Sequence, residues 1–382
     1  MEAPVLIAHL VYRLDYGGLE NGLVNLVNRL PERRFRHAIL CLAGFGAFRR
    51  RIAREDVEVF SVDKREGKDP RAYLRVLRHL RRLRPDVVHT RNLGTIDLQW
   101  LALAAGVRHR VHGEHGFVAE DPRGLASRSL RIRRACRPAI QRYVAMSRDI
   151  AGWLERDVGV PASRIRQIYN GVDTVTFRPD GALPPDLPWG DVARETIVVF
   201  GTVGRLDRIK NQAALIDALA AIVRRDPRAR ARLRLIIVGD GPERSALEDT
   251  TRRHSLADVV WFAGARNDIP ELMRAMDVFV LSSRNEGISN TILEAMASAL
   301  PVVAARVGGN PELVAHGSTG ALYDPTAPDA LAAALAAYAD GASLRREHGL
   351  AARRRICEGF SLEAMVGRYE SFYDELVGRP GS

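Results

Sequence analysis

The sequence is poor in cysteine and contains no long apolar run. Its three cysteines, Cys41, Cys136 and Cys357, stand far apart among 382 residues. This odd number and spacing give neither a disulfide framework nor a zinc motif, which favours a reducing compartment. The run Val5–Leu10 is far too short for a secretory leader or a membrane span and is predicted to be a buried strand. We therefore expect a cytoplasmic protein.

Two kinds of cofactor signature are also missing. The glycine-rich segments Gly17-Gly18 and Gly239-Asp-Gly241 lack the third glycine of the dinucleotide fingerprint. The sequence has no D-x-D acid pair to hold a metal ion. His109, His112 and His115 recur every third residue, but a strand would not point all three the same way. We expect no cofactor and no metal, and His115 is either a hydrogen-bonding residue of a binding cleft or a structural histidine.

Negative charge is scarce in the first half of the chain. Residues 1–180 hold 33 Lys and Arg against 20 Asp and Glu, and the remainder holds 24 against 26. The excess indicates a polyanionic or membrane-surface partner, or else only solvated faces of an arginine-rich protein. Nucleic-acid binding is supported by charge alone, because the sequence shows no aromatic stacking platform and no recognisable module. We expect no nucleic-acid partner.

Apolar strands alternate with helices twice along the chain, which predicts an α/β protein with two parallel sheets covered on both faces. The proline- and glycine-rich residues 179–195 read as a linker. We expect an N-terminal domain at 1–178 and a C-terminal domain at 196–360. Two such doubly wound domains would leave a cleft, and their ligands would bind beyond the carboxyl ends of the strands.

The residues that follow these strands carry the candidate chemistry. Gly17-Gly18 follows the first strand and either approaches a phosphate or forms a plain tight turn. Gly204-Arg205 and Lys210 follow the first strand of the second domain. An arginine fork with a lysine point charge suits a diphosphate, and the alternative is a surface loop.

Glu286 and Glu294 flank a predicted helix start after the apolar run Val278–Leu281. Open helix amides attract an anion, and carboxylates accept hydrogen bonds from hydroxyls, which together describe a sugar nucleotide. The alternative is local, because Thr291-Ile-Leu-Glu294 matches a capping box and Glu286 could be a solvated loop acid.

Taken together, the motifs resemble the family-4 retaining glycosyltransferases of the GT-B fold, which has two Rossmann-like domains facing a cleft. The motifs, in order, are Gly17-Gly18-x-Glu20, His115-Gly116, Asn170-Gly171-Val-Asp173, Gly204-Arg205 with Lys210, Gly239-Asp240-Gly241, Glu286-x7-Glu294 and Gly308-Gly309-Asn-Pro311-Glu312. The stretches 14–21 and 307–312 are similar to sugar transferases associated with exosortase and bacterial exopolysaccharide loci.

The resemblance implies a nucleotide-sugar donor, either a UDP- or a GDP-sugar, in the second domain. Arg205 and Lys210 would hold its diphosphate, Glu286 its sugar and Glu294 its ribose, while His115 would bind the sugar from the first domain. The implied catalytic residues are His115, Arg205, Lys210 and Glu286. The implied donor-binding residues are Gly17, Gly18, Gly204, Arg205, Lys210, Arg266, Glu286, Gly287, Ser289, Asn290, Thr291 and Glu294, with Arg266 in the segment 264–269 that would receive the base. Ser289-Asn290 stands where the family commonly has a glycine.

The resemblance also implies attack on the same face as leaving-group departure, with retained configuration and without a metal. A glycan or lipid-linked acceptor would bind the first domain, and residues 361–382 would form a helix crossing back to it. Two arginine-rich segments, Arg71–Arg84 and Arg123–Arg142, suit an anionic inner membrane surface, or are solvated helix faces. A sugar-nucleotide epimerase or hydrolase of the same fold is the alternative activity, and a basic nucleic-acid-binding protein is the alternative of another class.

Overall fold

The computed structural model describes residues 3–15, 17–67, 69–116, 121, 125–189 and 194–379. The chain divides into two compact units: unit 1 is Met1–Gly171 with Leu362–Ser382, and unit 2 is Val172–Ser361. Residues 172–178, expected in the first domain, thus belong to unit 2. The described part of the expected linker belongs there too, and residues 190–193 lie outside the description.

Unit 1 is built on a seven-stranded sheet in the order β3-β2-β1-β4-β5-β6-β7, in which every pairing is parallel. Its strands are β1 (Val5–Val11), β2 (Phe35–Cys41), β3 (Glu58–Ser61), β4 (Val87–Arg91), β5 (His109–Glu114), β6 (Arg142–Ala145) and β7 (Ile165–Gln167). The central strands are buried along almost their whole length, which explains their apolar sequences.

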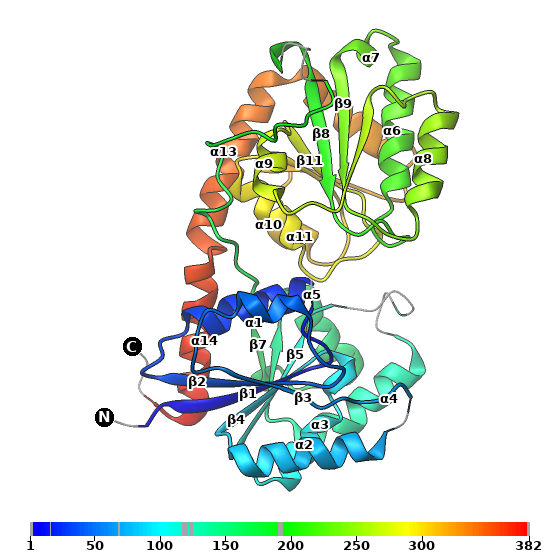
Figure 1. The fold of residues 1–382 in the computed structure, drawn as a ribbon. Coiled ribbons are helices and arrows are strands. Elements are labelled where there is room, and N and C mark those ends of the chain that lie inside the picture. Colours follow the sequence, from blue (N-terminus) through cyan, green and yellow to red (C-terminus); the bar gives the residue numbers. More distant parts are fainter. Residues whose placement is uncertain are drawn as a thin grey trace. The chain divides into compact units, whose positions relative to one another are not determined.

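Helices cover both faces of this sheet (Figure 1). They are α1 (Gly18–Arg29), α2 (Pro70–Leu83), α3 (Leu98–Ala104), α4 (Ser127–Cys136), α5 (Arg148–Trp153) and α14 (Leu362–Val377). The 3-10 turns are η1 (Ala47–Arg51), η2 (Leu93–Thr95), η3 (Arg137–Ala139) and η5 (Ala162–Arg164), and η4 (Leu154–Val158) is a π-helix. The apolar faces of α2 and α3 pack on one side of the sheet, and those of α1 and α14 pack on the other.

The C-terminal helix α14 completes unit 1. Tyr373 is fully buried and its ring packs against Phe35 of β2. Arg34 forms ion pairs with both Glu370 and Asp374 of the helix. The last helix of the chain is therefore a structural part of the unit formed by its first residues.

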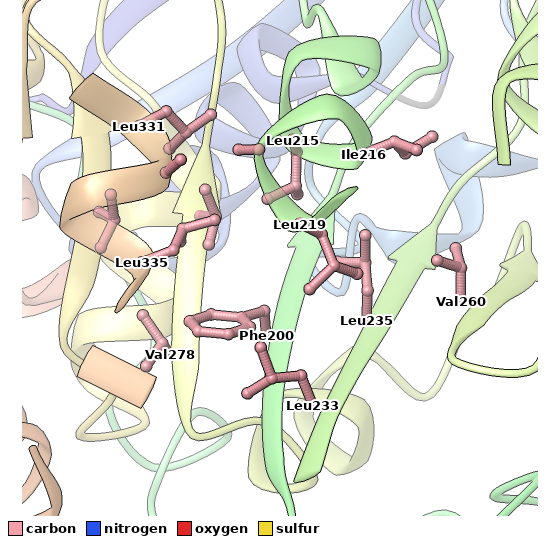
Figure 2. Close-up of a cluster of buried hydrophobic side chains, with 14 of the residues drawn as sticks. Phe200, Leu215, Ile216, Leu219, Leu233, Leu235, Val260, Val278, Leu331 and Leu335 are labelled. Atoms are coloured by element: carbon pink, nitrogen blue, oxygen red, sulfur yellow. The ribbon is translucent and has the colours of Figure 1, made fainter. Parts of the chain in front are cut away.

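Unit 2 is a six-stranded parallel sheet in the order β10-β9-β8-β11-β12-β13. Its strands are β8 (Val198–Val203), β9 (Leu233–Val238), β10 (Val260–Gly264), β11 (Val278–Leu281), β12 (Val302–Ala305) and β13 (Gly320–Tyr323). Its helices are α6 (Gln212–Arg225), α7 (Ala229–Arg232), α8 (Arg244–Arg253), α9 (Ile269–Arg274), α10 (Asn290–Ala297), α11 (Asn310–Leu313), α12 (Ala330–Asp340) and α13 (Ala342–Gly359), with the 3-10 turn η6 (Arg194–Thr196). Figure 2 shows how Leu215 and Leu219 of α6 and Leu335 of α12 meet Phe200 and Leu235 of the sheet.

The sequence pattern predicts a helix over 125–142, a strand over 143–146 and a helix from a Ser147 cap to about residue 157, and the structure differs at all three. The first of these helices, α4, ends at Cys136, and Arg142 already belongs to β6. Ser147 caps α5 as expected, accepting a hydrogen bond from the Ile150 amide at 3.1 Å. That helix ends at Trp153, however, and continues as the π-helix η4 before Gly159 closes it in a left-handed conformation.

Each sheet has one point where the strand order reverses, between β1 and β4 in unit 1 and between β8 and β11 in unit 2. In open parallel sheets a crevice opens at this point, beyond the carboxyl ends of the two strands. The loops after these four strands are therefore where binding residues are expected.

Candidate functional site

In unit 2, the loops that follow β8 and β11 bring two sequence-predicted residues into contact. Lys210 Nζ lies 2.6 Å from Glu286 Oε1, although 76 positions separate the residues. The side chain of Glu286 is 9% exposed and that of Lys210 26%. The ion pair thus sits partly shielded from water at the reversal point of the sheet, where it is stronger than a surface pair.

Lys210 is held in place by its own loop. The Asp207 carboxylate accepts hydrogen bonds from the Ile209 amide at 3.0 Å and the Lys210 amide at 2.9 Å, so the loop turns tightly. The Ser282 hydroxyl donates to the carbonyl oxygen of Lys210 at 3.1 Å and ties this loop to the one after β11. The lysine is therefore positioned from two strands at once.

Glu286 is fixed by contacts at both its side chain and its backbone. The Ser283 hydroxyl donates to the same Oε1 at 2.6 Å. Gly308 adopts φ +47°, and any side chain there would overlap the backbone of Glu286. The Gly309 amide donates to the Glu286 carbonyl oxygen at 3.3 Å. Only glycine at position 308 allows the two loops to approach so closely.

Helix α10 does not begin where the capping-box interpretation requires. Ser289 is the N-cap, and its hydroxyl accepts from the Ile292 amide at 3.3 Å. Thr291 lies inside the first turn and Glu294 in the second, so Glu294 is not the reciprocal acid of a capping box. That interpretation is wrong. Asn290 is the first residue of the helix, and Gly287 lies in the loop before it.

The two arginines predicted in unit 2 have different surroundings. The Arg205 side chain is 72% exposed and lies 4.0 Å from Asp207, so it projects into solvent from the Gly204 turn. Arg266 instead ion-pairs with Asp186 and Asp268, and its guanidinium lies over the Trp261 ring. These two carboxylates raise the pKa of Arg266 above its ordinary value.

In unit 1, the glycine segment after β1 forms the start of α1. Gly17 is the N-cap in an extended conformation, and Gly18 is the first helical residue. A side chain at position 17 would overlap the Glu20 carboxylate, which thus lies at this helix start. Burial raises the pKa of Glu20, against the lowering effect of its own backbone hydrogen bond and of Arg91.

His115 follows the last residue of β5. Its amide donates to Asn92 Oδ1 at 2.7 Å, and both of its ring nitrogens are buried without a hydrogen-bond partner in the described part of the protein. Burial, with a further contribution from Arg91, lowers the pKa of His115 to about 3. The imidazole is therefore neutral and can either donate or accept a hydrogen bond.

The other two histidines of the every-third pattern lie elsewhere. His112 contacts Thr90 Oγ1 at 2.8 Å and Glu114 Oε1 at 3.2 Å in the core. His109 is the first residue of β5 and so lies at the other end of this strand from His115. Among the residues with described positions, no three His, Cys, Asp or Glu side chains are grouped to hold a metal ion.

The arginine-rich segments are only partly surface charge. Arg75 of α2 hydrogen-bonds the Val62 and Asp63 carbonyl oxygens, and Arg133 of α4 is buried with Glu114, 2.6 Å away. These two arginines are structural, so neither belongs to an exposed basic face. The exposed members are Arg71, Arg78, Arg81, Arg82, Arg84, Arg128, Arg131 and Arg134, and Arg123 lies outside the described residues. No described helix is long and apolar enough to span a membrane.

Several residues at or just after the carboxyl ends of the strands were not predicted from the sequence: Asp207, Ser282, Ser283 and Arg91. Ser282 and Ser283 directly follow the strand Val278–Leu281, so their place after an apolar run was the available signal. The sequence pattern predicts a strand over 87–89 only, whereas β4 extends to Arg91, so Arg91 was not identified as a strand end.

Comparison with known proteins places these motifs in a family. Residues 16–176 match the model "Glycosyltransferase Family 4", and residues 197–340 match "Glycosyl transferases group 1". The chain is 28% identical over 312 residues to the putative glycosyltransferase EpsF of Bacillus subtilis, covering 78% of each protein. It is also 28% identical over 322 residues to the UDP-Gal:alpha-D-GlcNAc-diphosphoundecaprenol alpha-1,3-galactosyltransferase of Escherichia coli, covering 81% of this chain and 80% of that protein.

Other matches are shorter or structural. The N-acetyl-alpha-D-glucosaminyl L-malate synthase of Bacillus anthracis is 28% identical over 217 residues, and the match spans only 55% of that relative's length and 57% of this chain. The crystal structure of Anabaena Alr3699/HepE in complex with UDP and glucose superimposes with a TM-score of 0.82 at 23% identity, covering 97% of this chain and 100% of that one. That likeness shows the GT-B fold. Together with the two family models, which cover most of the chain, it leads to one conclusion: the protein belongs to the family-4 glycosyltransferases.

Proposed function

We propose that this glycosyltransferase moves a sugar from a UDP- or GDP-sugar to a glycan or lipid-linked sugar acceptor, with retention of anomeric configuration, in bacterial exopolysaccharide assembly. The observation that carries the proposal is the contact of Lys210 with Glu286 at the reversal point of the unit 2 sheet. A cation and an acid at the same crevice match the two parts of a nucleotide sugar, its diphosphate and its hydroxyls.

The donor would bind unit 2 through residues with separate tasks. Lys210 and the exposed Arg205 neutralise the negative charge that develops on the leaving diphosphate, with the α10 amides at Asn290 and Thr291 as further donors. Glu286 accepts hydrogen bonds from the donor sugar, and Glu294 from the ribose. Two relatives support this donor class: one is named for UDP-Gal, and one solved structure contains UDP and glucose.

His115 in unit 1 would hydrogen-bond the sugar being transferred. Its ring is neutral, and neither nitrogen is committed to another described residue. A neutral imidazole can donate to or accept from a hydroxyl without adding positive charge beside the positively charged anomeric carbon of the transition state. Gly17 and Gly18 would meet the diphosphate with backbone amides, once the Glu20 carboxylate has moved from the helix start.

The acceptor would bind unit 1 at the cytoplasmic face of a membrane. The exposed arginines of α2 and α4 attract anionic headgroups, at roughly 1 kcal/mol for each residue near the surface. Leu74 of α2 and Trp100 and Leu103 of α3 are exposed apolar side chains of the kind that enter a membrane interface.

The test is a panel of UDP- and GDP-sugars incubated with lipid-linked and free glycan acceptors, scored by nucleotide release and by NMR of the product. We expect free nucleotide together with an extended acceptor whose new linkage has the anomeric configuration of the donor. An inverted linkage would contradict retention. An altered donor without an extended acceptor would indicate an epimerase instead, and release of nucleotide and free sugar alone would indicate a hydrolase.

A further inference from the structure

Unit 1 carries a buried cation at the reversal point of its own sheet. Arg91 is the last residue of β4, next to β1, and is only 3% exposed. Its Nη1 lies 3.1 Å from Nδ1 of His9 on β1, and Tyr373 of α14 is near enough to feel its charge. The guanidinium is thus held between two neighbouring strands at the place where a parallel sheet binds ligands.

The histidines around this guanidinium are neutral. Burial and the nearby Arg91 lower the pKa values of His9 and His89 well below their ordinary range, so both rings are uncharged at neutral pH. No Asp or Glu of the described residues forms an ion pair with Arg91 within 4.0 Å. Glu20 feels its charge, but the Glu20 carboxylate lies at the start of α1. Burying a charge without an opposite charge costs free energy, which suggests that this arginine is kept for a function.

The corresponding point of unit 2 shows the contrast. There the cation, Lys210, has the carboxylate of Glu286 at 2.6 Å. The two reversal points thus each carry a cation, and among the described residues only the cation of unit 1 has no carboxylate within 4.0 Å. An arginine fork matches the oxygens of a phosphate group, which would supply the missing negative charge.

We propose that Arg91 is the anchor of a second phosphate-binding site, located in unit 1, which holds a phosphate group of one of the two substrates. The proposal rests on the proposed function for the identity of those substrates. The phosphate belongs either to the lipid-linked acceptor or to the donor diphosphate, and both present the same chemistry to the guanidinium. Asn92 links this site to the sugar-binding residue, because its side chain accepts from the His115 amide.

The experiment measures binding of inorganic pyrophosphate to the whole chain by calorimetry at low salt. It is done in a Lys210→Gln background, which weakens the expected site in unit 2. We expect Arg91→Gln to reduce the remaining affinity at least tenfold, as is typical for loss of a charge-assisted hydrogen bond. Arg91→Lys keeps the charge but not the fork, and should show an intermediate loss. Affinities of both variants within twofold of the background would overturn the proposal.

Arg108→Gln is the matched control. Arg108 is exposed and directly precedes β5. The Arg108→Gln substitution therefore removes the same charge at the amino-terminal end of the strands, away from the proposed site. Its pyrophosphate affinity should equal that of the background, and an equal loss in both variants would mean that only net charge matters and would overturn the site. If Arg91→Gln does not fold, as judged by its circular dichroism, the comparison of Arg91→Lys with Arg108→Lys decides.

A competition arm identifies the source of the phosphate. Pyrophosphate binding that persists in saturating UDP assigns Arg91 to the acceptor, and binding that UDP abolishes assigns it to the donor. Either result supports the site. Failure of sugar transfer with every donor, while Arg91-dependent pyrophosphate binding remains, would count against the proposed function alone.

Discussion

Lys210 Nζ and the Ser283 hydroxyl both lie 2.6 Å from the same oxygen of Glu286. The cation expected to hold the donor diphosphate is therefore already partnered by the acid expected to hold the donor sugar. A diphosphate that attracts Lys210 must compete with Glu286, and the freed carboxylate then becomes available to hydroxyl groups. Donor binding and release of Glu286 would thus be coupled.

Replacing Lys210 tests this coupling. Lys210→Met should lower kcat about a hundredfold, because the leaving diphosphate loses a preorganised positive charge. It should also destabilise unit 2 by about 1–3 kcal/mol, because Ser283 is then the one described side chain that still donates to the Glu286 carboxylate. Initial rates and urea unfolding measure the two effects. Arg208→Met, a 90% exposed residue of the same loop, is the control and should change neither. Unchanged transfer by Lys210→Met would contradict its assigned role.

Helix α10 contains an observed cap, Ser289, and a residue proposed to bind the donor, Glu294. Ser289→Ala removes the observed N-cap and should cost about 1 kcal/mol of stability. Glu294→Gln retains the size of the side chain but should weaken UDP binding about tenfold, through loss of the ribose contact. Thermal unfolding and calorimetry with UDP distinguish the two. UDP binding by Glu294→Gln at wild-type strength would remove Glu294 from the donor site.

The buried histidines predict how stability depends on pH. Burial lowers the pKa of His37 to about 3, from an ordinary value of 6.5, and Arg54 adds to the effect. Between these values the unfolded chain binds a proton that the folded chain does not, so the stabilisation is complete above pH 6.5 and is lost as the pH falls toward 3. Each such histidine contributes a slope of up to about 1.4 kcal/mol per pH unit.

His37→Gln should therefore flatten the decline of unit 1 stability below pH 6.5. Amide hydrogen exchange of the slowest β1 and β2 amides, measured from pH 7.5 to 4.5, reports this slope. At pH 7.5, the difference in unfolding free energy between His37→Gln and the wild type gives the cost of the lost packing and of the lost His9 contact alone. A slope identical to that of the wild type would show that His37 does not govern the acid sensitivity.

Chelation tests metal independence. Transfer should survive excess EDTA, because Arg205 and Lys210 provide the positive charge that a metal ion would otherwise supply. Rates with EDTA, with Mg²⁺ and with Mn²⁺ should agree within about twofold, because the divalent ions would change only the screening of charges. Activity that disappears with EDTA and returns with a divalent ion would contradict this mechanism.

Liposome binding tests the basic face of unit 1. Replacing Arg71, Arg78 and Arg81 of α2 together by Gln should cost about 3 kcal/mol of binding to vesicles with anionic lipid at low salt. Replacing Arg224, Arg225 and Arg228 of unit 2 removes the same charge from exposed positions elsewhere and should leave binding unchanged. Co-sedimentation at two salt concentrations measures both. Wild-type protein that does not sediment with anionic vesicles would end the membrane proposal.

Much of the fold could be predicted from the sequence, because each buried parallel strand is a short apolar run that can be recognised from its own residues. The strand Val278–Leu281 has the bounds of the apolar run that predicts it. Boundaries set by tertiary contacts could not be read in this way. Arg142 starts a strand because it pairs with Val111, and no feature of its own segment indicates this.

The candidate site shows the same division. The motif spacing pointed to Lys210 and Glu286 separately, but their contact depends on loops from two strands, fixed by Asp207 and Ser282. Arg91 could not be found from its segment, because its surroundings come from β1 and α14. Arg91 is distinguished by having no described carboxylate within 4.0 Å. This depends on three-dimensional packing and not on local sequence.

The place of α14 in unit 1 has a consequence for the order of folding during synthesis. Unit 2 is one continuous stretch and can fold as soon as residue 361 has left the ribosome. The sheet of unit 1 is synthesised first, yet its apolar face around Val5, Ile7 and Phe35 is covered only in part, by α1, until Tyr373 emerges. The N-terminal unit is therefore begun before unit 2 and completed after it, so a chain that stops short of α14 would leave part of the apolar face of its earliest strands exposed to aggregation.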